Sequence, residues 1–291
     1  MSYDLFFTEP EITLEQFTGY FSGRNHYKVK NTQGWYENED TGVYFCFDYS
    51  NEPEKDPEAQ DGNVAFNINL FRPHFFALEA EPEVQSLVNH FGFKIHDPQT
   101  HGMGDGPYSR DGFITGWNHG NEFAYSAFMN SGERPHIIHS RPGDELESIW
   151  QWNHTKDQTQ NTFGESVFAP RIMFIQIEGN IMSAVVWPDA IPTLIPQVDT
   201  LLIPRQEFAP RRFFKRQDDI CIAPFETVFP LFEPFRANGY PVPAFALSYT
   251  TAPEDLSSFV KGLNPHAGKI EGVPMDQVLN HELIERLRKS Q

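Results

Sequence analysis

The segment from Trp35 to Tyr49, WYENEDTGVYFCFDY, constrains the fold more than any other part of the sequence. From Val43 onward, aromatic and β-branched side chains fall at every second position, which is typical of a strand packed on one face. The preceding stretch, 37–42, holds three acids, an Asn and a Gly, and these residue types accept the backbone conformations of a tight turn. The pattern therefore predicts a β-hairpin with an acidic turn.

The sequence on either side of this hairpin predicts further strands and helices. Apolar residues at alternate positions predict strands at 3–7, 27–29, 63–71 and 93–96. Thr13 and Gln16 fit a capping box, which predicts a short helix that Gly23 ends. The sequence Glu-Pro-Glu at 81–83 predicts the first turn of a second helix, because Pro fits there and acids complement the helix dipole.

The later part of the chain shows fewer clear patterns. The polar segment 155–164 resembles a linker. Alternation returns at 173–187, where Gly179 and Asn180 predict the turn of a second hairpin. Apolar spacing and basic residues near the end predict one helix over 274–289.

These elements together predict an α+β fold with antiparallel or mixed β-sheets and helices packed on one face. We expect two subdomains in the chain. An acidic α+β subdomain occupies 1–97, and a second α+β subdomain occupies 166–291. An irregular and partly helical region at 98–165 connects them.

The net charge of −18, from 40 acidic and 22 basic side chains, is unevenly distributed. Residues 1–62 alone hold 13 acids and 4 bases. Such a surface repels phosphate backbones, so nucleic-acid binding is not expected, whereas it attracts basic proteins. No apolar run approaches the roughly 20 residues of a membrane helix, and no signal-peptide pattern is seen. No membrane association and a cytoplasmic location are therefore expected.

Motifs for catalysis and cofactor binding are absent from the sequence. It holds no G-x-S-x-G elbow, no P-loop and no G-x-G-x-x-G loop. Cys46 and Cys221 lie among apolar neighbours, so we predict buried free thiols rather than nucleophiles. No cofactor is expected, and an enzyme is the less favoured class.

A scattered group of histidines supports the alternative of a hydrolase-type enzyme. His96, Asp97 and His101 fall near a Gly-rich loop, and His136 and His139 form an H-I-I-H pair. Such side chains can bind a metal ion or transfer protons, with or without a metal. Their spacing matches no zinc motif, so structural or solvent-exposed histidines are the favoured interpretation.

A basic segment with Arg211, Arg212 and Arg216 stands out in this acidic chain. Guanidinium groups bind phosphate and carboxylate through paired N–H donors, so a small-anion binder is a second alternative. Pairing with the neighbouring acids Asp218 and Asp219 is the favoured interpretation.

The leading hypothesis is a cytoplasmic binding protein that docks or neutralises a basic protein partner, for example a bacterial toxin-immunity protein. Aromatic side chains beside charges are typical of binding hot spots. The acidic turn also fits a purely solvent-exposed role or a metal contact, although its spacing is not that of a calcium loop. The predicted contact residues are two aromatics and the acids that follow them: Trp35, Tyr36, Glu37, Glu39, Asp40, Glu52, Glu54 and Asp61.

Overall fold

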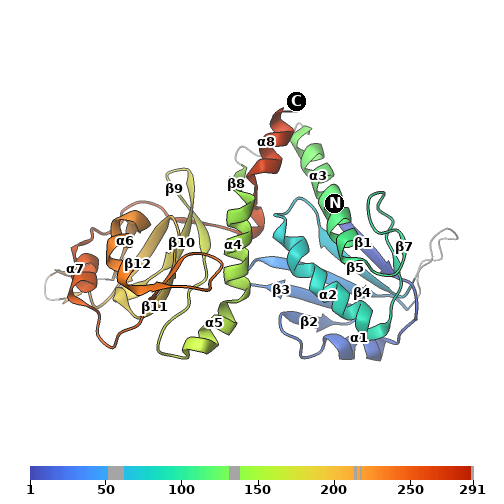
Figure 1. Ribbon diagram of the computed structural model, residues 1–291, viewed down its shortest axis with the longest axis horizontal. Coiled ribbons are helices and arrows are strands. Elements are labelled where there is room, and N and C mark those ends of the chain that lie inside the picture. Colours follow the sequence, from blue (N-terminus) through green and yellow to red (C-terminus); the bar gives the residue numbers. More distant parts are fainter. Residues whose placement is uncertain (52–61, 131–137, 213–214, 217, 290–291) are drawn as a thin grey trace. The chain divides into compact units, whose positions relative to one another are not determined.

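The computed structural model describes the chain apart from residues 52–61, 131–137, 213–214, 217 and 290–291 (Figure 1). The side chains of 211–217 are likewise outside the description. The described residues form two compact units, one made of 1–146 with 276–291 and the other of 147–275. The predicted α+β fold is confirmed. The predicted division at 97 and 165 uses other boundaries and stays a prediction.

The first unit is built on a seven-stranded sheet with the order β2-β3-β4-β5-β1-β6-β7. Every neighbouring pair in it is antiparallel. The predicted hairpin is confirmed as β3 and β4, with Tyr36 opposite Phe45. The seven strands of this sheet are β1 (Ser2–Phe7), β2 (Tyr27–Lys30), β3 (Gln33–Asn38), β4 (Val43–Tyr49), β5 (Val64–Asn69), β6 (Ile95–His96) and β7 (Asp105–Gly106).

Three helices, α1 (Leu14–Phe21), α2 (Phe75–Phe91) and α3 (Arg110–Asn130), cover one face of this sheet. Figure 1 shows α2 lying across the strands. Phe21 of α1 stacks on Phe47 of β4 with ring centroids 5.1 Å apart. Phe113 of α3 meets Tyr3 of β1 edge-on at 5.5 Å. The alternation of the strands therefore buries one row of aromatic side chains beneath the helices, which is the core of the unit.

The two helix starts predicted in this unit had different outcomes. The capping box of α1 is confirmed, because the Thr13 side chain accepts from the Gln16 N–H and the Gln16 side chain accepts from the Thr13 N–H. The predicted start at 81–83 is wrong, because α2 begins at Phe75 and Pro82 lies inside it. Buried residues of α2 extend upstream of Pro82, and their packing outweighs the one helical hydrogen bond that Pro82 cannot donate.

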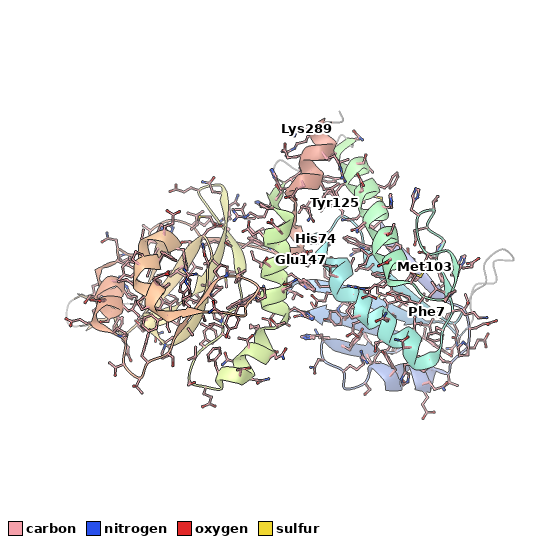
Figure 2. All side chains as sticks on the ribbon, in the orientation of Figure 1. Phe7, His74, Met103, Tyr125, Glu147 and Lys289 are labelled. Carbon is pink, nitrogen blue, oxygen red and sulfur yellow. The ribbon has the colours of Figure 1, made fainter. Side chains whose placement is uncertain are left out.

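The end of the chain returns to the first unit. There β8 (His139–Arg141) pairs in parallel with β19 (Val278–Asn280), and α8 (His281–Lys289) follows. The single helix predicted over 274–289 is therefore wrong in its first half. Leu279 of β19 and Ile284 of α8 pack with Tyr125 of α3, which is labelled in Figure 2. This apolar cluster holds the final segment in place.

The second unit contains a five-stranded mixed sheet with the order β15-β12-β10-β9-β18 and a three-stranded sheet with the order β11-β17-β16. The predicted second hairpin is confirmed as β9 and β10. Only the pair of β10 and β12 is parallel in the larger sheet. The strands of the second unit are β9 (Met173–Ile177), β10 (Asn180–Val186), β11 (Thr193–Pro196), β12 (Thr200–Arg205), β13 (Arg211–Arg212), β14 (Lys215–Arg216), β15 (Asp219–Pro224), β16 (Arg236–Ala237), β17 (Ala244–Leu247) and β18 (Glu271–Val273).

The remaining elements are helical. They are α4 (Gly143–His154), α5 (Lys156–Phe163), α6 (Phe225–Phe232), α7 (Glu254–Gly262) and the short 3-10 helices η1 (Pro188–Ala190), η2 (Glu233–Phe235) and η3 (Met275–Gln277). The linker predicted at 155–164 is wrong, because α5 occupies it. This helix lacks an apolar stripe, and the Gln160 side chain ties it to the carbonyl of Val167 and the N–H of Ala169. No helix among the described residues is long and apolar enough to cross a membrane.

Both cysteines are buried and free, as predicted. Burial and the nearby Asp48 carboxylate raise the pKa of the Cys46 thiol to about 12. Burial also raises the pKa of the Cys221 thiol. Both thiols are therefore kept in the protonated form, which is unreactive as a nucleophile.

Candidate functional site

The acidic turn of the first unit connects β3 to β4. The Gly42 N–H donates to the Asn38 carbonyl at 2.8 Å, and Gly42 has a positive φ of 72°. Glu37 and Glu39 are exposed, while Asp40 is half-buried. The Glu37 carboxylate lies 2.9 Å from the Lys28 ammonium of the neighbouring edge strand. Two acidic side chains, Glu37 near the end of β3 and Glu39 in the turn, are therefore held at the surface.

A buried carboxylate fixes this turn from below. Glu79 of α2 is 2% exposed, and a single oxygen, Oε1, accepts three side-chain hydrogen bonds. The donors are the hydroxyl of Tyr36 at 2.8 Å, the amide of Asn38 at 2.9 Å and the hydroxyl of Thr41 at 3.0 Å. Because these donors stand before, at and after the end of β3, the turn has one well-defined conformation.

The two aromatic residues proposed as anchors differ in exposure. Trp35 is half-buried and stacks on Tyr44 of β4, with centroids 5.8 Å apart. Tyr36 is only 3% exposed and packs face to face on Phe45 at 4.3 Å. Tyr36 is therefore part of the core, and we remove it from the contact surface as a correction. The predicted contacts Glu52, Glu54 and Asp61 lie outside the described residues.

Sequence reasoning missed that the acids of α2 connect elements inside the unit. Glu81 accepts from the Tyr108 hydroxyl at 2.8 Å, and Glu83 accepts from Arg24 at 2.7 Å and from the Tyr27 hydroxyl at 3.0 Å. Burial is the largest cause, and these carboxylates a further one, of the raised pKa values of the Tyr27 and Tyr108 hydroxyls. The only sequence signal for these contacts was the position of the acids among apolar residues at helical spacing.

The predicted histidine and aspartate group forms no single cluster among the described residues. His96 Nδ1 lies 2.5 Å from a carboxylate oxygen of Asp105. The His101 ring stacks instead on His119, with centroids 4.5 Å apart. His136 lies outside the described residues, and His139 lines a separate pocket with Arg72. Within the described ranges, no group of three His, Cys, Asp or Glu side chains could hold a metal ion.

Asp97 has a structural role in the Gly-rich loop. Its carboxylate is buried and accepts from the Tyr3 hydroxyl at 2.7 Å and from the backbone N–H groups of Gln99 and Met103 at 3.0 and 2.9 Å. These bonds fold the Gly-rich loop back onto β1. Since the described donors occupy both oxygens, Asp97 is a loop anchor in this structure rather than an accessible base.

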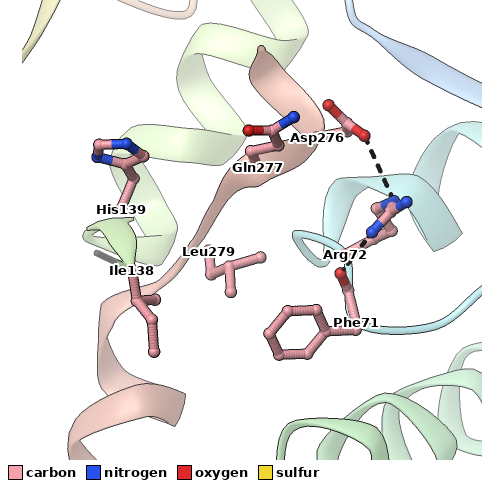
Figure 3. Close-up of a pocket in the computed structure, with 7 residues that line it drawn as sticks. All are labelled: Phe71, Arg72, Ile138, His139, Asp276, Gln277 and Leu279. Atoms are coloured by element: carbon pink, nitrogen blue, oxygen red, sulfur yellow. Dashed lines mark hydrogen bonds and ion pairs between the residues drawn. The ribbon is translucent and has the colours of Figure 1, made fainter. Parts of the chain in front are cut away.

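The pocket that His139 lines lies within the first unit and has a volume of about 190 Å³. Figure 3 shows the polar groups of His139, Gln277 and Asp276 along one side and the apolar side chains of Ile138 and Leu279 along the other. Burial raises the pKa of the Asp276 carboxyl above its ordinary value, and the nearby Arg72 guanidinium offsets only part of this rise. Sequence reasoning named only His139 of this set, because the other residues come from distant segments.

In the basic segment, β13 and β14 pair antiparallel, with Arg211 opposite Arg216 and Arg212 opposite Lys215. The side chains of these residues are outside the description. One proposed acidic neighbour, Asp219, is already engaged by the buried Arg205, with its oxygens 2.8 Å from Nε and 2.9 Å from Nη2. The anion-binding alternative for Arg211, Arg212 and Arg216 stays a prediction.

Comparison with known proteins gave no relative. No protein-family model matches the chain, no curated protein matches it, and no solved structure matches it.

Proposed function

We propose that the protein is a binding protein whose first unit docks a basic protein partner through the acidic turn at 37–40, with Trp35 beside it. A bacterial toxin-immunity protein is the concrete form of this proposal, and a cytoplasmic location belongs to it. The observation that carries the proposal is the rigid presentation of Glu37 and Glu39 above the buried Glu79.

The distribution of charge between the units supports this proposal. The first unit holds 26 acidic and 12 basic side chains, a net charge of −14, whereas the second holds 14 and 10, a net charge of −4. A field of this size raises the association rate with a positively charged protein and falls off with salt. Charge alone gives no specificity, so the fixed geometry of the turn is the second requirement.

Preorganisation of the turn supports specificity. Ordering a flexible acidic loop on binding costs conformational entropy, roughly 0.5–1.5 kcal/mol for each long side chain that becomes fixed. Here the bonds to Glu79 fix the turn backbone before any partner arrives. Trp35 and Glu37 lie on the same face of β3, so an aromatic surface and an acid are offered side by side.

The proposal is tested by pull-down of the full-length protein from the lysate of its own source, at low and high salt. The test variant combines Glu37→Gln, Glu39→Gln and Asp40→Asn. The matched control combines Glu165→Gln, Glu178→Gln and Glu207→Gln, which removes three exposed acids from the second unit. Both variants change the net charge by the same amount, so they separate a local surface from total charge.

We expect one basic protein to be retained at low salt, lost with the test variant and kept with the control. Equal loss from both variants would show that only total charge matters and would contradict the proposed surface. Retention of no basic protein at either salt concentration would also contradict the proposal.

A further inference from the structure

The pocket of the first unit places an acid and a base beside each other. Arg72 Nε lies 3.5 Å from Oδ2 of Asp276, and both side chains keep about a fifth of their surface exposed, 22% and 19% respectively. This distance exceeds that of a good hydrogen bond, so the two groups form an ion pair without a direct hydrogen bond. Figure 3 shows both groups at the same end of the pocket.

Asp276 is an incompletely satisfied acceptor. Among the described residues no side chain donates a hydrogen bond to its carboxylate, which interacts with its own backbone N–H and with the Arg72 guanidinium. A largely buried carboxylate with so few donors is costly, and burial raises its pKa accordingly. A ligand with a cationic N–H group would supply the donors that the protein does not.

Arg72 has N–H groups that are available to a ligand. Its Nε and Nη2 groups donate to the Tyr44 hydroxyl at 3.1 and 2.6 Å, and its Nη1 group donates to the Phe71 carbonyl at 3.0 Å. A guanidinium carries five N–H bonds, so two remain without a partner among the described residues. The bonds that are made fix the orientation of the guanidinium, which favours recognition of a carboxylate.

The rest of the pocket limits the size and nature of a ligand. The volume of about 190 Å³ is below the roughly 300–1,000 Å³ typical of sites for drug-sized ligands, which favours a small molecule over a nucleotide. The wall opposite the charged pair is apolar and includes Phe71, Ile138 and Leu279. A short aliphatic chain therefore fits on that side, with a polar head against the charged pair.

We propose that this pocket binds a free α-amino acid with a short aliphatic side chain. Its carboxylate pairs with Arg72, its ammonium group pairs with Asp276, and its side chain packs between Ile138 and Leu279. The two charges of an α-amino acid are as close together as those of the protein pair, so both ionic contacts form at once. This site is separate from the acidic turn and does not depend on the proposed docking of a partner.

The test is isothermal titration of the full-length protein with L-leucine, N-acetyl-L-leucine, 3-methylbutylamine and glycine. L-leucine is expected to bind. N-acetylation removes the ammonium charge, the amine lacks the carboxylate, and glycine lacks the aliphatic chain, so each is expected to bind about 10- to 100-fold more weakly. No heat with L-leucine, or equal affinity for all four compounds, would overturn the proposal.

Two variants assign the binding to this pocket. Asp276→Asn is expected to weaken L-leucine binding by about tenfold or more, because a charge-assisted hydrogen bond is lost. Glu15→Gln removes one exposed acid from the same unit, on α1, and is expected to leave the affinity unchanged. Equal affinity of the Asp276→Asn variant and the unaltered protein would overturn the assignment. The comparison of ligands needs no variant, so a folding defect in Asp276→Asn leaves the proposal testable.

Discussion

The hydroxyl of Tyr36 donates a 2.8 Å hydrogen bond to Glu79, and both residues are almost completely buried. Glu79→Ala would leave this hydroxyl and the side chains of Asn38 and Thr41 without their acceptor. We expect a loss of about 3–5 kcal/mol in the free energy of unfolding, measured by urea denaturation, because buried donors become unsatisfied. Glu11→Ala, at an exposed position, should change stability by less than about 0.5 kcal/mol. Similar effects from both variants would contradict the role of Glu79.

Replacing Gly102 and Gly19 by alanine should change the stability of the protein in opposite directions. A Cβ at Gly102 would lie 1.8 Å from Oδ2 of the buried Asp97, so the loop anchor must move. We expect Gly102→Ala to destabilise the protein by about 2 kcal/mol or more. A Cβ at Gly19 of α1 meets nothing within 4 Å, and Gly19→Ala should stabilise by about 0.5–1 kcal/mol. Thermal denaturation of the two variants checks the difference in sign.

Arg205 is expected to be essential for the C-terminal end of α7. Its Nη1 group donates to the carbonyls of Val260 and Leu263 at 2.8 and 3.1 Å, while the rest of the guanidinium holds Asp219. Arg205→Met should cost about 3–5 kcal/mol, because Asp219 and these carbonyls are left unpaired. Hydrogen exchange should accelerate in α7. Arg205→Lys should cost less, and an equal cost would show that charge is not the cause.

The stability of the protein should depend on pH through Asp276. Burial raises the pKa of this carboxyl above its ordinary value of 3.8, so the folded state binds the proton more tightly than the unfolded state. Stability from this group therefore rises as pH falls through the folded pKa. Asp276→Asn should melt at a higher temperature than the unaltered protein at about pH 7, and the difference should shrink towards about pH 4.5. A difference that grows on acidification would contradict this sign.

Local patterns were sufficient for the hairpins and for α1. The alternation in 43–49 and the Thr13–Gln16 capping box involve only neighbours in sequence, so their physics is visible in the sequence. The start of α2 was missed because Pro82 resembled a first-turn proline. Tertiary packing of Phe75 and Phe76 against the sheet overrode that signal.

The candidate sites were less predictable because they join distant segments. Glu79 meets its donors across 38 to 43 residues, and Arg72 meets Asp276 from the other end of the chain. The spacing of apolar residues along the sequence does not reveal pairs of residues that are so far apart in the chain. The strand at Val278–Asn280 was missed for the same reason, since its partner β8 is more than a hundred residues away. The alternating positions of Trp35 and Tyr36 were visible, but not which face the helices would cover.

The return of residues 276–291 to the first unit has a consequence for folding during synthesis. The second unit, 147–275, is continuous in sequence and can complete its contacts as soon as it has left the ribosome. The first unit must wait, because β8 lacks its partner strand and Tyr125 lacks its apolar neighbours until β19 and α8 emerge. The part of the chain made first is thus the part finished last, and its late closure is a long-range, slow step.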